Sequence, residues 1–302
     1  MSPVTSPFFI IAGPTAVGKS AVAVAVADRC GGEIVGADAF QIYRGLEILT
    51  AQPSAELCAR TPHHLVGEIP LTQSFDVAQY LHAARQHIAE IHARGRMPIV
   101  TGGTGLYLRA LTRGLADLPG ADAALRADLE KESLADLQHR LAELDPLGAA
   151  QIDVKNPRRV LRALEVCLLT GRPFSSFREQ WSAPPPHGPG GIVLTFDRET
   201  LNARIDRRTE AMFAAGVIDE VRAAEAAGPT SSQTLGFREI RALIAGDLGQ
   251  MDCITAIQHA TRRYAKRQMT WFRRETALEP IDLASVSDLA PLAESLARKA
   301  AG

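Results

Sequence analysis

Eight consecutive residues near the start of the chain have the composition of a phosphate-binding loop, GxxxxGK[ST]. They are Gly13, Pro14, Thr15, Ala16, Val17, Gly18, Lys19 and Ser20. Glycines let successive backbone N–H groups turn toward an anion, a following helix adds partial positive charge, and Lys19 adds a full charge. The Ser20 hydroxyl can reach a Mg²⁺ ion. The loop predicts a site for a di- or triphosphate with magnesium. Most such loops hold a nucleotide such as ATP, but the pattern alone does not name the phosphate compound.

Two further groups follow strands that we expect beside this loop. Asp38 comes directly after the apolar run 33–37, and the glycine turn 102–105, which contains Thr104, follows the run 98–102. Ligands of open α/β sheets bind along the carboxyl edge of the strands, so these groups are expected near the loop. Asp38 fits either a metal-side carboxylate or a general base. Thr104 can donate to an oxygen of a leaving phosphate.

Short β-branched runs alternate with helical stretches in the first third of the chain. The runs 8–12, 33–37 and 98–102 are expected to be buried strands, with helices at 19–30 and 77–93 between them. Strand, helix, strand, helix, strand is typical of a parallel sheet with helices on its faces. We therefore predict an α/β fold with a P-loop NTPase-like parallel sheet.

The pattern changes near residue 118 and changes back near residue 192. Leucines at helical spacing fill 122–145, and Asn156 with Pro157 predicts the start of a helix that Gly171 ends. A Pro/Gly-rich stretch follows, and then the apolar run 192–196. We predict an all-helical insertion domain at 118–191 and a catalytic core made of 1–117 and 192–302.

Composition excludes several classes of protein. Of the 302 residues, 46% are hydrophobic and 22% charged, which argues against a disordered chain, and a net charge of -1 gives no general attraction to nucleic acid or membrane. The four cysteines form no CxxC pair, as expected in a reducing cytosol. No signal peptide or membrane span is evident, so we expect a cytoplasmic protein without a membrane partner.

Together these elements resemble the tRNA dimethylallyltransferases, the IPP transferase family, of the bacterial type. The similarity runs in family order over nearly the whole chain. The matching stretches are GPTAVGKS at 13–20, ADAFQIYRGLEILTAQP at 37–53, PHHL at 62–65, GGTGLYLRAL at 102–111, NPRRVLRALEV at 156–166, TLGFREI at 234–240 and YAKRQMTWFRR at 264–274.

The resemblance implies a transferase of the tRNA-modifying kind. Its members move a dimethylallyl group from dimethylallyl diphosphate to the exocyclic 6-amino group of the adenosine next to the anticodon, and release diphosphate. By this resemblance the P-loop holds the donor's diphosphate with Mg²⁺, Asp38 takes the amino proton, Thr104 contacts the bridging oxygen and Arg208 clamps the diphosphate charge. The partners would be dimethylallyl diphosphate and the anticodon stem-loop of tRNA, and we expect a monomer.

The resemblance also implies a set of tRNA contacts. They are Asp38, Ala39, Phe40, Gln41, Thr104, Arg126, Arg158, Arg159, Val160, Leu161, Arg162, Gln233, Thr234, Leu235, Gly236, Phe237, Arg238, Thr261, Arg262, Arg263, Tyr264, Ala265, Lys266, Arg267 and Gln268. The chain departs from the usual family residues at three positions. Ala39 replaces a serine, Leu49 a glycine and Gln52 a lysine, which leaves affinity and fine positioning open.

A basic segment near the end of the chain suits an RNA partner. From 261 to 274 there is no acidic residue and six basic ones, namely Arg262, Arg263, Lys266, Arg267, Arg273 and Arg274. On a helix these six share one side, while Ile257, Tyr264 and Trp271 line the other. Such a cationic stripe is suited to phosphates. Arg158, Arg159 and Arg162 form a second basic cluster.

Three other functions are compatible with parts of this pattern. A small-molecule P-loop kinase explains the loop and Asp38 but leaves the basic segment unused. A prenyltransferase acting on free adenine nucleotides shares the chemistry, although the two basic clusters favour RNA. A non-catalytic RNA-binding protein would have no use for Lys19, Ser20 and Asp38.

The histidines give a weaker signal. His63 and His64 are adjacent on an expected strand, and neighbouring side chains rarely converge on one ion, so a structural or polar role is favoured over a metal site. His82, His87 and His92 are each five residues apart, a spacing that drifts around a helix, and we assign them no role.

Overall fold

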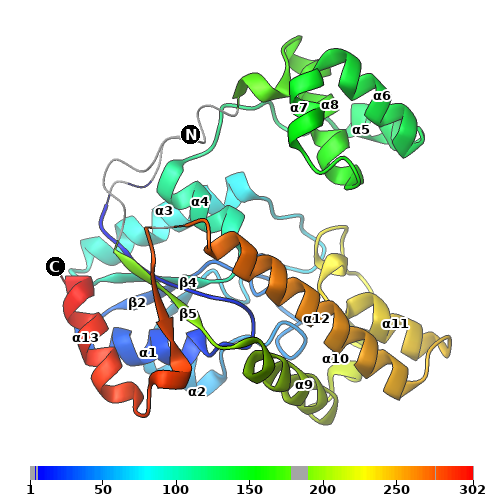
Figure 1. The fold of residues 1–302 in the computed structure, drawn as a ribbon. Helices are drawn as coiled ribbons and strands as arrows, with labels where there is room; N and C mark the ends of the chain where they lie inside the picture. The colour runs from blue at the N-terminus through cyan, green and yellow to red at the C-terminus, as the bar shows by residue number, and fades with distance from the viewer. Residues whose placement is uncertain (1–3, 5, 178–189, 276, 302) are drawn as a thin grey trace. The chain divides into compact units, whose positions relative to one another are not determined.

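The computed structural model describes residues 4, 6–177, 190–275 and 277–301 (Figure 1). The described residues form two compact units: 113–177 make a helical unit, and the remainder make a unit built on a β-sheet. The helical unit begins at residue 113, where the sequence pattern suggested 118. Gly191, which we placed in the insertion, is the first residue of strand β5 and belongs to the sheet.

Six parallel strands form the sheet, in the spatial order β3-β2-β4-β1-β5-β6. Their bounds are β1 Phe9–Ala12, β2 Glu33–Gly36, β3 His63–His64, β4 Pro98–Gly102, β5 Gly191–Thr195 and β6 Glu279–Asp282. The α/β fold with a parallel sheet is thus confirmed. β1 pairs with β4 on one side and β5 on the other, and β2 pairs with β4. The P-loop, Asp38 and the glycine turn therefore leave neighbouring strands at one edge.

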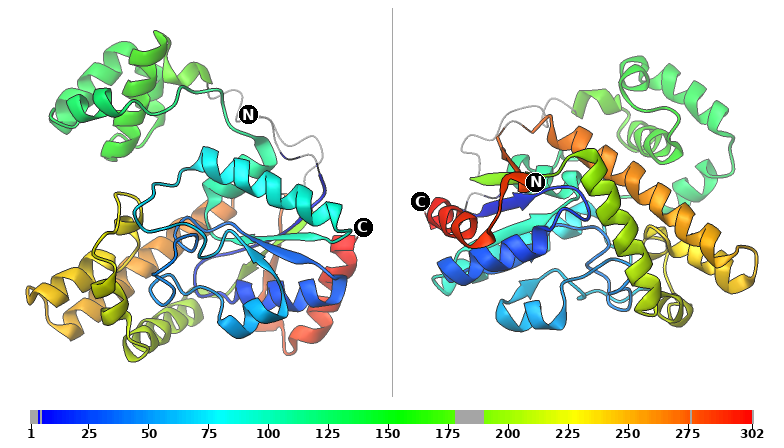
Figure 2. Two further views of the ribbon diagram at one scale, coloured as in Figure 1. Left: turned by 180° about the vertical axis from the view of Figure 1, so that it is seen from behind. Right: turned by 60° about the horizontal axis from the view of Figure 1, so that its bottom comes forward.

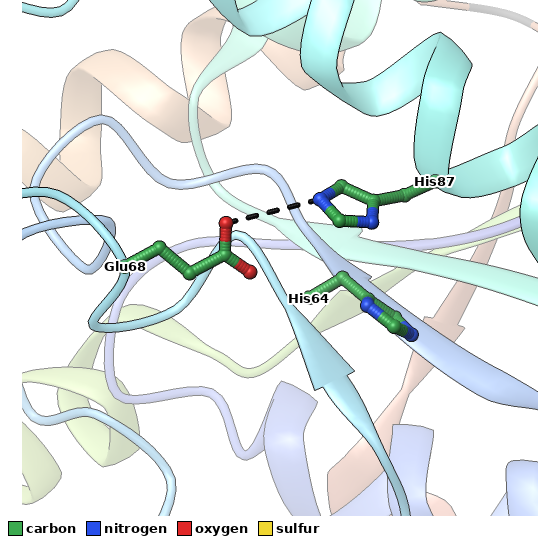
Figure 3. A group of neighbouring side chains, drawn as sticks. All are labelled: His64, Glu68 and His87. Carbon is green, nitrogen blue, oxygen red and sulfur yellow. Dashed lines mark ion pairs between the residues drawn. The ribbon is translucent and has the colours of Figure 1, made fainter.

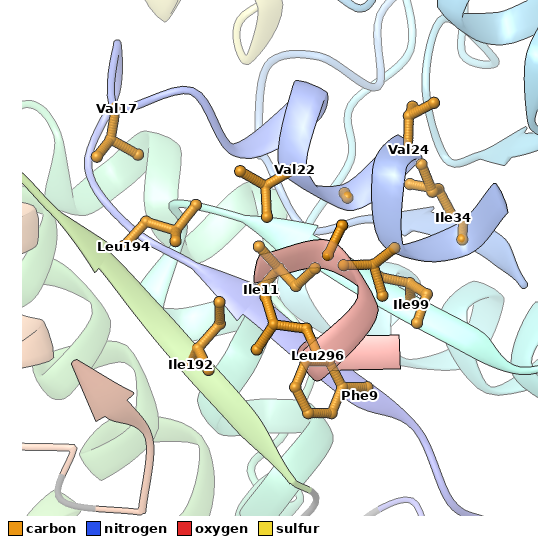
Figure 4. Packing of buried hydrophobic residues seen from close by; sticks show 14 of the residues in the cluster. Phe9, Ile11, Val17, Val22, Val24, Ile34, Ile99, Ile192, Leu194 and Leu296 are labelled. Atoms are coloured by element: carbon orange, nitrogen blue, oxygen red, sulfur yellow. The ribbon is translucent and has the colours of Figure 1, made fainter. Parts of the chain in front are cut away.

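Helices α1 (Lys19–Cys30) and α13 (Leu289–Ala301) pack together on one face of the sheet. Alternate strand residues point toward them, as the two-residue period of a strand requires. Figure 4 shows Phe9 and Ile11 of β1 packed with Val22 of α1 and Leu296 of α13. All four side chains are at least 98% buried. This packing fixes the start of α1, and with it the P-loop.

Helices α3 (Val77–Ala93) and α4 (Gly105–Arg113) cover the opposite face (Figures 1 and 2). A capping box between Asp76 and Gln79 starts α3. Tyr80 of α3 and Tyr107 of α4 stack with ring centroids 3.9 Å apart, so the two helices are locked together above β2 and β4. The short α2 (Ala55–Arg60) begins at a Ser54 cap.

A second hydrophobic cluster lies beyond the carboxyl edge of the sheet, within the same unit. It joins the segment around Leu46 and Leu49 to four helices, namely α9 (Arg198–Ala214), α10 (Val217–Ala223), α11 (Phe237–Ala245) and α12 (Gln250–Phe272). Glu220 accepts hydrogen bonds from the N–H groups of Ile48 (2.7 Å) and Leu49 (2.8 Å), which fixes the segment to α10.

The helical unit has its own core. It contains α5 (Ala123–Leu129), α6 (Leu134–Leu144), α7 (Pro146–Gln151), α8 (Pro157–Thr170) and a 3₁₀ turn (Phe174–Phe177). Leucines of α5, α6 and α8 form the core. The predicted helix start is confirmed, because Asn156 caps α8 with Pro157 in its first turn, and Gly171 ends the helix at φ 65°. Within the described residues, every helix is too short or too polar to cross a lipid bilayer.

Candidate active site

The phosphate-binding loop is held in shape by contacts from three directions. A Cβ on Gly13 would lie 2.7 Å from the Leu194 carbonyl oxygen, so only glycine allows β5 this close. Lys19 Nζ donates to the Pro14 carbonyl at 2.8 Å, curling the loop around its own lysine. Arg204 of α9 donates from Nε to the Ala16 carbonyl at 2.7 Å. Ala16 has a positive φ of 65°, an uncommon conformation that this bond helps to hold.

The glycine turn 102–105 is glycine-rich because other backbone and side chains occupy the space of a Cβ. A Cβ on Gly102 would lie 2.1 Å from the Ala37 carbonyl oxygen. On Gly103 it would lie 2.2 Å from Gln268, and on Gly105 2.3 Å from the Trp271 ring, both in α12. The glycine turn GGTG (102–105) and the segment QxxW (268–271) therefore pack so closely that a side chain at Gly103 or Gly105 would displace Gln268 or Trp271.

Gln268 joins the two loops directly. Its Oε1 accepts from the Thr15 N–H at 2.9 Å, and its Nε2 donates to the Gly103 carbonyl at 2.9 Å. The residue is 5% exposed, so both hydrogen bonds are shielded from water. One amide thus fixes the distance between the phosphate loop and the turn that carries Thr104.

Asp38 and Thr104 are brought together, as their strands predicted. The Thr104 hydroxyl oxygen accepts from the Ala39 N–H at 3.0 Å, and the Thr104 N–H donates to the Ala37 carbonyl at 3.1 Å. Asp38 Oδ1 accepts from the Phe40 N–H at 3.0 Å. These bonds fix the orientation of the carboxylate beside the threonine.

Two buried basic side chains, Lys19 and Arg208, interact with the Asp38 carboxylate. Burial lowers the pKa of Lys19 to about 8, with Asp38 opposing the shift and Arg208 adding to it. Burial also lowers the pKa of Arg208, again opposed by Asp38. Arg208 Nε is buried and has no hydrogen-bond partner among the described residues. A buried cation with an unused N–H donor can form a strong charge-assisted hydrogen bond to an anion.

Arg204 is a site residue that the sequence analysis missed. Its guanidinium lies 5.0 Å from the centroid of the Phe196 ring and holds the P-loop as described above. It precedes Arg208 by one helical turn on α9, so the two share a face. That spacing was visible in the sequence, but nothing there indicated that α9 packs against a loop 188 residues away.

Two cavities meet at the centre of these groups. The larger, about 540 Å³, is polar, and its wall includes Lys19, Ser20, Arg204 and Arg207. The smaller has the more apolar wall of the two: seven polar residues line it together with Phe40, Leu49, Met212, Leu235, Ile257 and Tyr264. Four residues line both cavities, namely Thr15, Asp38, Thr50 and Arg208. The arrangement suits a substrate with an anionic end and an apolar end, whose junction lies beside a carboxylate.

The IPP transferase family model matches residues 41–275. The chain belongs to this family. It is 43% identical over 294 residues to the tRNA dimethylallyltransferase of Geobacter sulfurreducens. This alignment covers 93% of this chain and 94% of that protein. Its fold is similar to that of the tRNA isopentenylpyrophosphate transferase of Bacillus halodurans, with a TM-score of 0.70, 34% identity and 98% of each chain covered.

A eukaryotic dimethylallyltransferase acting on tRNA also has this fold. The TM-score is 0.79 at 25% identity, over 94% of this chain and 76% of that one. The expected family is thereby confirmed, and with it the expectation of a prenyl-transferring enzyme.

The structure separates the implied tRNA contacts of this IPP transferase into exposed and buried side chains. The exposed ones are Arg158, Arg159, Gln233, Arg238, Arg263, Lys266 and Arg267. The buried ones are Val160, Thr234, Phe237, Thr261, Ala265 and Gln268. Buried side chains position their segments, whereas the exposed set can meet a phosphate directly. Arg126 and Arg162 have another partner, because both bind the buried carboxylate of Glu165.

Two of the three departures from the usual family residues, Leu49 and Gln52, fall at the cavity walls. Leu49 is 6% exposed, packs in the second hydrophobic cluster and lines the apolar cavity. Gln52 donates from Nε2 to the Tyr43 carbonyl at 2.7 Å and lines the polar cavity. Ala39 keeps the backbone bond to Thr104. None of the three takes the place of Asp38, Thr104 or Arg208.

Proposed function

We propose that this IPP transferase family member transfers the dimethylallyl group of dimethylallyl diphosphate to the exocyclic 6-amino group of the adenosine next to the anticodon in tRNA, releasing diphosphate. The observation that carries the proposal is the meeting of the polar and apolar cavities at Asp38 and Arg208. A prenyl diphosphate has the matching polarity, and its breaking C–O bond would lie at that junction.

The basic groups serve the leaving diphosphate. Bond breaking adds negative charge to the bridging oxygen and the phosphates, and preorganised donors that meet this charge lower the barrier. Lys19, Arg208 and the N–H groups of the P-loop would bind the phosphates. The Thr104 hydroxyl accepts from the Ala39 N–H and lies within hydrogen-bonding reach of the Tyr264 hydroxyl, so its proton would turn to the bridging oxygen when the donor binds.

Asp38 serves the nucleophile. The lone pair of an adenine amino group is delocalised into the ring, so the nitrogen attacks only if a proton leaves as the new bond forms. A positioned carboxylate taking that proton contributes about 10²–10⁴-fold in rate. The nitrogen forms a bond to the prenyl carbon, the bond to diphosphate oxygen breaks, and the proton goes to Asp38. No covalent intermediate with the protein is required.

Magnesium fits the donor set at the polar cavity. The Ser20 hydroxyl lines it, and a hard oxygen ligand of this kind suits Mg²⁺ together with substrate phosphates, while the Asp38 carboxylate remains available as the base. Bound there, the ion would neutralise diphosphate charge and favour its departure. Ser20 is the residue that we assign to it.

A tRNA substrate is supported by the exposed cations of α12. Arg263, Lys266 and Arg267 lie on its solvent face. An adenine in a loop is also cheaper to unstack than one in a duplex, by a few kcal/mol at most. A small-molecule kinase or an enzyme for free adenine nucleotides would leave this face without a partner.

One assay tests the proposal. Purified protein, Mg²⁺, dimethylallyl diphosphate and unmodified tRNA are incubated, and the tRNA nucleosides are analysed by mass spectrometry. The expected product is a prenylated adenosine. Transfer to free adenosine monophosphate at equal efficiency, or phosphoryl transfer from ATP without a prenyl donor, would support the rival functions instead.

A matched variant tests the base. Asp38→Asn keeps an oxygen to accept from the Phe40 N–H, so the loop should stay folded, but an amide cannot take the proton. Turnover is expected to fall by about 10²–10⁴-fold with tRNA affinity little changed. Wild-type turnover in this variant would remove Asp38 from the mechanism.

A further inference from the structure

Three side chains from separate segments converge away from the active site. His64 comes from β3, Glu68 from the loop that follows it and His87 from α3 (Figure 3). One potential ligand atom of each lies within 4.8 Å of those of the other two. His87 Nε2 is 3.8 Å from Glu68 Oε2, and the two imidazole rings have centroids 4.7 Å apart. All three residues are half-buried.

The atoms that face the shared space are those left over from other contacts. His64 Nε2 lies 2.7 Å from Glu33 Oε2, which leaves Nδ1 for a ligand. Glu68 Oε1 accepts from the Leu65 N–H at 2.6 Å, which leaves Oε2. A tetrahedral ion with bonds of 2.0–2.1 Å separates its ligand atoms by roughly 3.3 Å, so small side-chain rotations would bring these three into range.

His64 also has a carboxylate on its other ring nitrogen. Glu33 faces His64 at 2.7 Å, whereas His87 Nδ1 is buried without a hydrogen-bond partner among the described residues, with Glu90 3.6 Å away. Glu33 is itself fixed by Arg94 at 2.7 Å and by Arg96 at 3.3 Å. Metal-bound histidines in proteins usually donate their second N–H to a carboxylate or carbonyl, which orients the ring and raises its basicity.

We propose that His64, Glu68 and His87 form a binding site for one divalent transition-metal ion, with zinc as the best fit. Two imidazole nitrogens and one carboxylate oxygen favour zinc or its neighbours over Mg²⁺ or Ca²⁺, which prefer all-oxygen sites. A structural or polar role was expected for both His63 and His64; with His64 as a ligand, that role is kept for His63 alone, whose Nδ1 lies 2.7 Å from the Thr61 carbonyl oxygen. The partner of His64 is His87, which the spacing along α3 had left without a role.

The ion would join α3 to the loop behind the active site. The Gly67 N–H donates to the Gln41 carbonyl at 2.8 Å, and the Glu68 N–H donates to the Ile42 carbonyl at 2.9 Å. Gln41 follows Asp38 by three residues and lines the polar cavity. A metal at Glu68 would therefore stiffen the segment that carries the catalytic carboxylate, without touching substrate.

Metal titration of the full-length protein tests the site. Protein stripped with a chelator is titrated with Zn²⁺ alone, and bound zinc is measured by competition with a chromogenic chelator. Wild type should bind one zinc tightly. His87→Ala and Glu68→Gln should each weaken binding by more than the roughly 10–100-fold that loss of an outer carboxylate costs. His82→Ala, an exposed histidine on the same helix, is the matched control and should bind as wild type does.

The visible spectrum of bound Co²⁺ reports the type of ligand atoms directly, so it does not depend on how a variant's stability changes. Co²⁺ bound to wild type should show the visible bands of a four- or five-coordinate nitrogen and oxygen site, which the His87→Ala variant lacks while the His82→Ala variant keeps them. Failure of wild type to bind either ion would overturn the proposal. So would equal loss in the two histidine variants, or a sulfur-to-cobalt charge-transfer band, because that band would place the ion on cysteine.

Discussion

At the scale of single residues, two buried cations and one carboxylate lie together in a poorly solvated wall of the candidate active site. Lys19 and Arg208 both have a pKa lowered by burial, and Asp38 partly offsets each shift. The protein thus keeps cations that are incompletely neutralised before substrate binds. A bound anion would neutralise the remaining positive charge of these cations. Because the site is poorly solvated, a diphosphate would bind here more strongly than at exposed lysines.

Lys19 gives a pH-dependent prediction. Its pKa of about 8 in the folded protein means that the ammonium loses its proton as the pH rises through 8, and diphosphate affinity should fall with it. At pH 9 the loss from this group should be about tenfold relative to pH 7. Calorimetric titration with inorganic diphosphate and Mg²⁺ from pH 6.5 to 9.5 measures it. Lys19→Met is the control, because its curve contains only the titration of the ligand itself; parallel curves for the two proteins would contradict the assignment.

The residues of this site differ in how far the sequence revealed them. Gly13–Ser20, Asp38 and Thr104 follow strands, so local pattern and the geometry of parallel sheets sufficed to bring them together. Arg204 and the bridging role of Gln268 depend on where α9 and α12 lie in space, which no local pattern states. The metal-ligand cluster was missed for the same reason, since β3 and α3 each contribute one histidine.

At the scale of elements, α12 does two separate jobs with its two sides. Toward the sheet, Gln268 and Trp271 fix the glycine turn and, through Thr15, the phosphate loop. Toward solvent, Arg263 and Arg267 are exposed, whereas Arg262 forms an ion pair with Asp206 of α9. Of the other residues in the predicted stripe, Lys266 is exposed on α12, while Arg273 and Arg274 follow the end of the helix. The family resemblance had assigned the whole stretch 261–268 to RNA.

The two sides of α12 should therefore respond differently to substitution. Arg263→Ala and Arg267→Ala should each weaken tRNA binding and reduce the slope of log affinity against log salt by roughly one, with stability unchanged. Gln268→Leu should instead leave the Thr15 N–H and the Gly103 carbonyl unpaired, at about 1–3 kcal/mol each, and weaken diphosphate binding. Filter binding at several salt concentrations and urea unfolding separate the effects.

Arg298→Ala, on α13 and paired only with the neighbouring Glu294, is a control for loss of an exposed arginine. It should change neither property. A Gln268→Leu protein of normal stability that loses only tRNA affinity would instead favour a direct RNA contact for the amide.

The elements themselves were largely predictable. Four of the six strands, together with α1, α3 and α8, were located within one residue at each end, because each is an apolar run or a capped periodic segment. The strand β6, of sequence Glu-Pro-Ile-Asp, carries no apolar run and was not found, and β3 was expected only as a strand under His63 and His64, with no apolar run to define its ends. Their place in the sheet comes from pairing with β2 and β5, which is a tertiary effect.

At the scale of the whole molecule, each of the two units has its own hydrophobic core and its own buried charged groups. In the helical unit such a group is Glu165, which is fully buried and accepts from Arg126, Arg162 and the Asp122 N–H. Burial raises the pKa of this carboxyl, but the hydrogen bonds from the two arginines and from the backbone outweigh burial and lower it. A buried charge held in this way joins α5 to α8 within the unit.

Glu165→Gln should consequently unfold the helical unit selectively. The amide is nearly isosteric and can still accept from Asp122, but both arginines lose their counter-charge, a cost on the order of 3 kcal/mol. Hydrogen exchange measured by mass spectrometry should speed up in peptides from α5 and α8 and stay unchanged in peptides from β1 and β4. Glu143→Gln, which removes an exposed carboxylate of α6 paired only with His139, should change neither set. Faster exchange throughout the chain would show that the two units unfold together, and that their separate cores do not make them independent in stability.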